Sequence, residues 1–235
     1  EREFSYVTEV QPVWDRYCVQ CHDYGKHAEA TLNLAGDLGL AFNVSYNELW
    51  RKGYVGAIGA GPAEVQLPYS WGSHASRLVK TLRDGHYGVQ LDRESWDRVV
   101  TWIDINGPYY PTYASAYMDN LYGRCPLPNA ELARLKELTG VDLLDGGDQQ
   151  VEETWISFTR PEISPLLARA DGDAKREEVL GLIREGAKRL AERPRGDARE
   201  MPLDGIELAR ERKYEERAAR EREAREAVLS GRKVY

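Results

Sequence analysis

Two cysteines and one histidine lie close together near the start of the chain, in the run CVQCH. They are Cys18, Cys21 and His22. On a helix, positions i, i+3 and i+4 share one face. Two thiols in this arrangement can form thioether bonds with the two vinyl groups of a heme, while the adjoining imidazole binds the iron. The spacing predicts one covalently attached heme c, with His22 as the proximal ligand.

Two other kinds of site use closely spaced cysteines. A structural zinc site needs a fourth ligand and usually a second Cys or His pair, and the sequence has no such pair near the motif. A thioredoxin-like redox pair follows a strand and opens a helix, a context that is also missing here. We therefore favour heme attachment over zinc binding or a chance cluster.

The third cysteine, Cys125, leaves an odd number of thiols in the chain. Three cysteines are too few for a disulfide framework. We expect a buried or capped thiol at this position, while an intermolecular disulfide and a ligand role stay open.

The motif is expected at the end of a short amphipathic helix. Apolar residues recur at helical spacing over residues 10–21. Residues 8–11 have the spacing of a capping box, and Pro12 suits the first turn of a helix. The helix is therefore expected to run into the motif.

Two further helices are expected on either side of a short loop. The first spans 73–83, with Ser73 as its N-cap, and the second begins after the cap residue Asp92. His86 opens the loop 86–91 that joins them. A loop between two helices resembles the ligand-bearing loop of small cytochromes c.

The second axial position of the iron has a short list of candidate ligands. His86 is the first choice because of its loop, and His74 is the second; Met118 or an open site are the remaining alternatives. His27 follows His22 too closely to reach the opposite face of a heme, so we expect it at the surface. Imidazole at both axial positions would favour a low reduction potential and a closed iron suited to electron transfer.

A succession of short motifs runs from Val10 to Leu127. They are PVW at 12–14, CVQCH at 18–22, LNL at 32–34, FNVSY at 42–46, GSHASRL at 72–78, GH at 85–86 and WIDINGPYY at 102–110. In this order they resemble the cytochrome c domain of hydrazine synthase alpha-subunit-like and planctomycete-type cytochromes, and a weaker likeness extends to WISFTRPE at 155–162. The resemblance implies an iron held by His22 together with His86 or, failing that, His74.

The chain also departs from that family. Hydrazine synthase alpha subunits have a propeller domain and a second heme at which chemistry is done, whereas this chain has one attachment motif and no propeller-like repeats. The iron of that catalytic heme is held by a tyrosine a few residues beyond its motif. Here Tyr24 is too close to His22, and Lys26 occupies the more suitable distance. The resemblance therefore carries over an electron-carrying role and not catalysis.

Composition and charge exclude several classes of protein. The 235 residues include 10% aromatic residues, far more than a disordered chain has. The net charge of −7 would repel a polyanion, so we expect no nucleic-acid partner. No apolar stretch approaches the roughly 18 residues that a transmembrane helix needs. In bacteria heme c is attached outside the cytoplasm, so we expect a periplasmic or extracellular protein whose signal sequence is not part of this chain.

The expected architecture is mainly α. We expect a cytochrome c-like heme domain over 1–127, a connecting segment over 128–171 and a charged helical extension over 172–235. Within the extension, residues 174–192 have an apolar stripe that should pack on another element. Residues 203–229 keep helix formers with few apolar residues, so this helix is expected to be solvated or to lie on a partner.

These observations favour a monoheme electron carrier over a catalyst. We expect it to work with redox partner proteins and to form a homo- or hetero-oligomer through its C-terminal helical region. Two alternatives stay open, a heme enzyme with an open distal site and a structural heme subunit.

Overall fold

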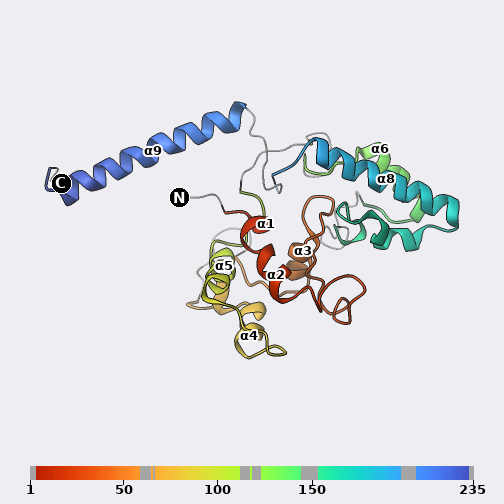
Figure 1. Ribbon diagram of the computed structural model, residues 1–235, viewed down its shortest axis with the longest axis horizontal. Coiled ribbons are helices and arrows are strands. Elements are labelled where there is room, and N and C mark those ends of the chain that lie inside the picture. Colours follow the sequence, from red (N-terminus) through yellow and green to blue (C-terminus); the bar gives the residue numbers. More distant parts are fainter. Residues whose placement is uncertain are drawn as a thin grey trace. The chain divides into compact units, whose positions relative to one another are not determined.

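The computed structural model describes residues 4–58, 65, 67–111, 117, 123–143, 153–196 and 205–232. These residues form α-helices and short 3-10 turns and no β-strand (Figure 1). The only strand-like pairings among them are isolated bridges, between Leu38 and Asn43 and between His86 and Val89. The prediction of a mainly α fold is confirmed. Within the described residues, no helix combines the length and the apolar character that a membrane span requires.

The chain divides into two compact units, Glu1–Arg199 and Glu200–Tyr235. The α-helices of the first unit are α1 (Tyr6–Glu9), α2 (Gln11–Tyr17), α3 (Val44–Arg51), α4 (Arg77–Arg83), α5 (Arg93–Asp104), α6 (Asn129–Thr139) and α8 (Asp173–Glu192). Its 3-10 turns are η1 (Gly72–His74), η3 (Glu153–Trp155), η4 (Pro161–Ile163) and η5 (Pro165–Arg169). The second unit contains α9 (Gly205–Leu229).

An aromatic core holds the first half of unit one together. Tyr6, Trp14 and Trp102 are fully buried at its centre. The Tyr6 hydroxyl accepts a hydrogen bond from Trp14 Nε1 at 2.8 Å and lies 2.8 Å from the Ser45 hydroxyl. The Tyr6 ring also packs against the Trp102 ring, with centroids 4.9 Å apart. Trp102 Nε1 also donates to the Pro108 carbonyl at 3.0 Å, so the polar atoms of these three central residues are paired.

The helix before the motif begins and ends differently from its prediction. The expected capping box at 8–11 does not form, because the chain is already helical in α1 and the Thr8 hydroxyl donates to the carbonyl of Ser5. α2 begins at Gln11 with Pro12 in its first turn, as predicted, and ends at Tyr17. The motif therefore follows the helix instead of forming its last turn.

The two helices around the predicted ligand loop are both present. α5 begins as expected, with the Asp92 side chain accepting a hydrogen bond from the Ser95 amide at 2.8 Å. α4 begins at Arg77 and not near residue 73, because the amide and hydroxyl of Ser73 both bond the Asp104 carboxylate, at 2.7 and 3.0 Å. A side chain held by a distant residue cannot cap its own helix.

A second core occupies the other half of unit one. α8 packs on α6 and on the turns η4 and η5, with Val179 and Ile183 fully buried, so the predicted apolar stripe of this helix is confirmed. Cys125 is also fully buried here, which confirms the expected buried thiol. Leu38, in the loop before α3, packs against this core, and its carbonyl accepts from the Phe158 amide at 2.8 Å.

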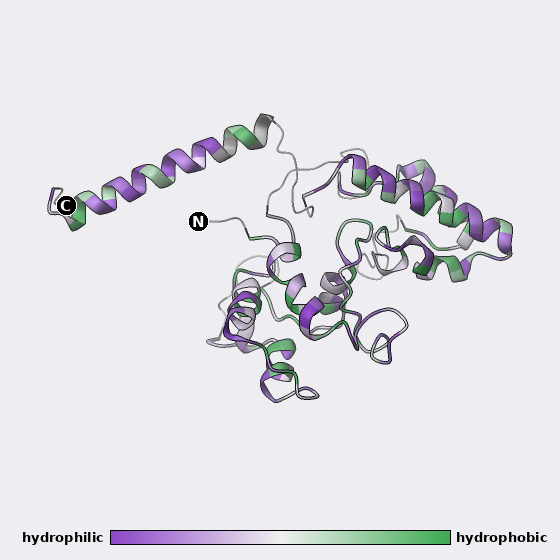
Figure 2. Cartoon of the chain, in the orientation of Figure 1, coloured by the Kyte–Doolittle hydropathy of each residue, from purple (hydrophilic) through white to green (hydrophobic). Residues whose placement is uncertain are grey.

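The second unit is a charged helix. Most of the described side chains of α9 are exposed, and an ion pair joins Glu216 and Arg220 at 3.7 Å. Figure 2 shows hydrophilic residues along most of this helix, with hydrophobic residues near its two ends. A helix without an apolar stripe does not form a core by itself.

Two glycines of α8 offer a matched test of how tightly the second core is packed. A Cβ at Gly186 would meet the Phe158 ring and lie 2.8 Å from Leu127 Cδ2, whereas a Cβ at Gly181 would meet no heavy atom within 4 Å. We expect Gly186→Ala to lower the free energy of unfolding by about 1–3 kcal/mol through overpacking. Gly181→Ala should raise it by up to about 1 kcal/mol through helix propensity. Urea unfolding followed by circular dichroism measures both, and equal midpoints for the two variants would contradict this packing.

Candidate functional site

The CVQCH motif forms a tight turn directly after α2. The Cys18 amide donates to the carbonyl of Trp14 at 2.8 Å, which closes the helix. The amides of Cys21 and His22 both donate to the carbonyl of Cys18, at 3.0 and 2.9 Å. The two thiols are half-buried and form no disulfide. The three side chains of the motif are thus held on one turn of backbone, as covalent attachment to a single cofactor requires.

The imidazole of His22 is oriented by the loop that follows it. Its Nδ1 lies 2.7 Å from the carbonyl oxygen of Leu32. Because a carbonyl only accepts, Nδ1 carries the hydrogen, and Nε2 keeps the lone pair that a metal needs. Burial lowers the pKa of His22; the bond to Leu32 acts against this, and the nearby His86 adds to it. A neutral, oriented imidazole is the form of histidine that binds a metal.

The first-choice distal residue lies beside the proximal one. The ring centroids of His22 and His86 are 5.8 Å apart, and their planes differ by 33°. Two metal–nitrogen bonds of about 2 Å, with about 1 Å more from each bound nitrogen to the centre of its ring, would separate the centroids by about 6 Å. The spacing therefore fits a pair of axial ligands on one metal ion.

A two-residue turn presents His86 to the site. The Val89 amide donates to the carbonyl of His86 at 2.9 Å, which closes the turn. The two central residues, Tyr87 and Gly88, have φ angles of +48° and +79°. Positive φ at both positions is typical of a type I′ turn, in which the first position seldom holds a tyrosine. The Tyr87 side chain is 99% exposed, and its ring meets the His86 ring edge-on at 5.0 Å.

The other candidate ligands lie elsewhere or outside the described residues. His74 is the last residue of η1, is exposed, and packs edge-on against the Tyr69 ring at 4.7 Å. His27 is exposed, as predicted. Met118 lies outside the described residues. Among the candidates that the structure describes, His86 is the one whose ring contacts that of His22.

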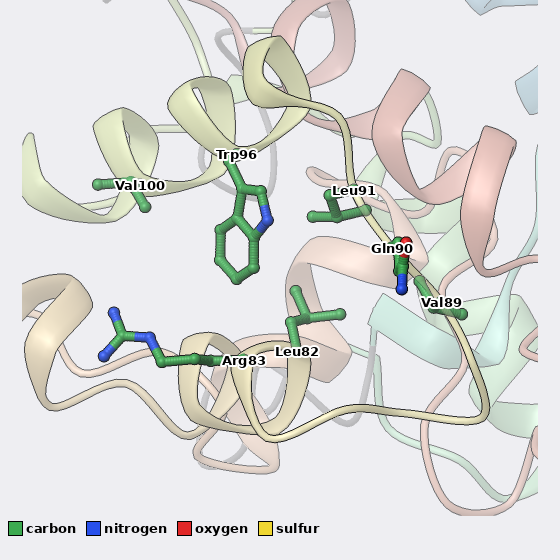
Figure 3. Close-up of a pocket in the computed structure, with 7 residues that line it drawn as sticks. All are labelled: Leu82, Arg83, Val89, Gln90, Leu91, Trp96 and Val100. Atoms are coloured by element: carbon green, nitrogen blue, oxygen red, sulfur yellow. The ribbon is translucent and has the colours of Figure 1, made fainter.

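An open pocket of about 530 Å³, lined by both apolar and polar side chains, lies between α4 and α5 and reaches the loop that carries His86. Its lining is Leu82, Arg83, Val89, Gln90, Leu91, Trp96 and Val100. Figure 3 shows Leu82 extending from α4 and Trp96 extending from α5 into the same space. Both side chains are half-buried and pack against the aromatic core on their other side. Half-buried apolar walls of this kind suit a flat apolar ligand such as a porphyrin.

The zinc alternative finds no support in the described part of the chain. No group of three or more His, Cys, Asp or Glu side chains that could hold a metal ion occurs there. A heme needs fewer protein donors, because the porphyrin supplies four nitrogens and the protein supplies the axial ligands. Cys18, Cys21, His22 and His86 match that smaller donor set, and the residues present fit a heme c.

The sequence analysis did not predict the contacts that several residues make beside the motif. The Leu32 carbonyl that orients His22 has no sequence signature, because any residue offers a carbonyl. Arg160 pairs with Asp23, the residue that follows His22, across a long stretch of chain. Tyr24 lies beneath the same guanidinium, and its buried hydroxyl has no hydrogen-bond partner among the described residues. The position of Asp23 and Tyr24 directly after the motif was the one feature of the sequence that could have pointed to them.

Comparison of the chain with known protein families, with curated proteins and with solved structures found no match. The likeness to hydrazine synthase-type cytochromes therefore stays a prediction that rests on the motifs quoted above. What the structure adds is independent of that likeness: two adjacent imidazoles, two thiols on one turn and a pocket that reaches the loop carrying the second imidazole.

In the chain without heme, the Cys18 thiol should differ from an ordinary cysteine. Burial, with Cys21 adding to it, raises the pKa of Cys18 to about 12. Because only the thiolate reacts, we expect the rate of Cys18 alkylation to rise about tenfold per pH unit from pH 7 to pH 10 without levelling. In urea the same cysteine should level near pH 8.5, the ordinary value. Peptide mass spectrometry after timed iodoacetamide pulses measures both profiles, and a plateau near pH 8.5 in the folded chain would refute the burial argument.

Proposed function

We propose that this chain is a c-type monoheme cytochrome that carries electrons, with heme c attached to Cys18 and Cys21 and its iron between His22 and His86. The observation that carries the proposal is the approach of the two imidazole rings to 5.8 Å. The chain contains four histidines. Two of them, His22 and His86, come from segments far apart in the sequence and lie side by side. A heme attached to the motif would need such a second histidine as the sixth ligand of its iron.

Each half of the proposed site has its own support. On the proximal side, the Leu32 carbonyl holds the His22 tautomer whose Nε2 is available to a metal. On the distal side, the hydrogen bond from the Val89 amide to the His86 carbonyl closes a turn that fixes the backbone of His86. A donor on a fixed backbone loses less conformational entropy on binding, so the pair favours a six-coordinate iron.

The pocket between α4 and α5 is a third observation that supports the proposal. Leu82, Leu91 and Trp96 present apolar surface to the cavity while their other sides pack on the aromatic core. Arg83 is the one charged residue in the lining, and a guanidinium suits the carboxylates that a heme carries at its edge. We assign these residues to the wall of the heme site.

A six-coordinate iron suits electron transfer. The heme supplies a one-electron couple, and two imidazole ligands leave no position at which a substrate could bind the metal. The heme-enzyme alternative needs an open distal position, which the placement of His86 beside His22 opposes. If the heme only supported folding and assembly, a second imidazole beside His22 would not be needed.

Location and partners follow from the same proposal. Covalent heme attachment implies a periplasmic or extracellular protein, and an electron carrier needs redox partner proteins. We assign the C-terminal helix α9 to assembly with a further subunit, because its exposed charged surface contributes nothing to a core. The net charge of −7 accords with the absence of a nucleic-acid partner.

Absorption spectroscopy of the purified holoprotein and of two histidine variants tests the proposal. The holoprotein should be low-spin in both oxidation states and indifferent to carbon monoxide. His86→Ala should become high-spin in the ferrous state and bind carbon monoxide, and added imidazole should restore the low-spin spectrum. A colourless protein whose mass equals that of the bare chain would refute heme attachment.

His74→Ala is the matched control for that experiment, because His74 is exposed and lies against Tyr69. We expect its spectrum to equal that of the unaltered protein. If His74→Ala becomes high-spin and His86→Ala does not, the distal ligand is His74. If neither variant changes, the distal ligand is neither histidine.

A further inference from the structure

A cluster of three charged side chains lies immediately beside the attachment motif. Asp23 follows His22 in the sequence, and Arg160 Nη2 and Nη1 lie 2.6 and 3.2 Å from its two carboxylate oxygens. The same guanidinium bonds Asp37, through Nε at 2.9 Å and Nη2 at 2.6 Å. One cation is therefore shared by two carboxylates, each held in a two-pronged contact.

The cluster is built into the protein and is not a chance surface pairing. The Asp37 side chain is 5% exposed and also accepts a hydrogen bond from the Ser157 hydroxyl at 2.6 Å. That hydroxyl accepts in turn from the Arg160 amide at 2.8 Å, which fixes the backbone of the arginine. Arg160 Nη2 lies 2.6 Å from an oxygen of each carboxylate, the geometry of two ion pairs that share one cation. Two carboxylates and one guanidinium give the cluster a net charge of −1.

Arg160 belongs to the second core, whereas the motif belongs to the first. The segment 157–160 is tied to residue 38 by two hydrogen bonds, from the Phe158 amide to the Leu38 carbonyl and from the Leu38 amide to the Thr159 hydroxyl at 3.0 Å. Arg160 extends this junction to the residues after His22, since its guanidinium also lies over the Tyr24 ring at 5.4 Å. The loop 23–34 that begins there supplies the carbonyl that orients His22.

We propose that Arg160 is a positioning residue that docks the heme loop on the second core and sets the reduction potential of the heme by halving the negative charge beside its proximal ligand. This inference rests on the proposed function. Consecutive Cα atoms are about 3.8 Å apart, so Asp23 is anchored within the screening length of about 8 Å at physiological salt from the backbone of the proximal ligand. Partial burial of the cluster weakens the screening further.

The sign of the effect follows from the charge of the iron. The ferric state has one more positive charge than the ferrous state, so loss of a nearby cation stabilises ferric iron and lowers the potential. Loss of a nearby anion does the opposite. Arg160→Gln should therefore lower the midpoint potential, and Asp23→Asn should raise it. The Asn side chain keeps an Oδ1 that can accept from the Tyr24 amide, as Asp23 does at 2.7 Å.

Spectroelectrochemical titration of the holoprotein and its variants tests this inference. Arg160→Gln and Asp23→Asn should shift the midpoint potential in opposite directions, and the double variant should return close to the unaltered value. Arg184→Gln is the control, since Arg184 forms a comparable but exposed ion pair with Glu162 within the second core, at 3.0 Å. Its potential should equal that of the unaltered protein.

The outcomes separate this inference from the proposed function. If the unaltered protein has no heme or no reversible one-electron couple, the proposed function fails. If it has both, but Asp23→Asn leaves the potential unchanged or lowers it, the inference fails while the function stands. Asp23→Asn keeps the bond between Arg160 and Asp37, so its result decides the matter even if Arg160→Gln does not fold.

Discussion

The hydroxyl of Tyr6 is the point at which the helices around the site are joined. Trp14 of α2 donates its indole hydrogen to this oxygen, and the Tyr6 ring packs against Trp102 of α5. α2 leads directly into the attachment motif, and α5 follows directly after the loop that carries His86. A buried hydroxyl that lacked partners would cost about 1–3 kcal/mol, so the pairing strongly restricts how these helices can shift. The aromatic core thereby sets the distance between the two imidazoles.

The second core gives the motif a support that a minimal heme domain would lack. α6 and α8 contribute no residue to the pair of imidazoles, yet the segment before η4 sends Arg160 to the residue after His22. A guanidinium held by two carboxylates and its own backbone is a rigid contact, and leaving one partner unpaired would be costly. In the proposed cytochrome, the second half of unit one therefore influences the electronic environment of the iron without touching it.

The proposed electron carrier also explains two features that neither core requires. Tyr87 adopts a left-handed backbone conformation that residues other than glycine rarely take, at the turn that carries His86. Strain of this kind, of order 1–3 kcal/mol, persists where the surrounding structure imposes it and is frequent at functional sites. The exposed Tyr87 ring and the half-buried imidazoles place the site at the protein surface, where a partner protein can approach.

Local sequence was enough to predict the features that depend on neighbouring residues. The spacing of Cys18, Cys21 and His22 acts within one turn of backbone, and the cap at Asp92 acts over three residues, so both follow from local geometry. Interactions between distant segments were beyond such reasoning. Whether His86 or His74 faces His22 depends on how α4 and α5 pack, and Ser73 fails as a cap because Asp104 binds it first. The pairing of Arg160 with Asp23 joins residues that approach each other only when two cores fold together, since no local periodicity encodes a contact between elements so far apart in the chain.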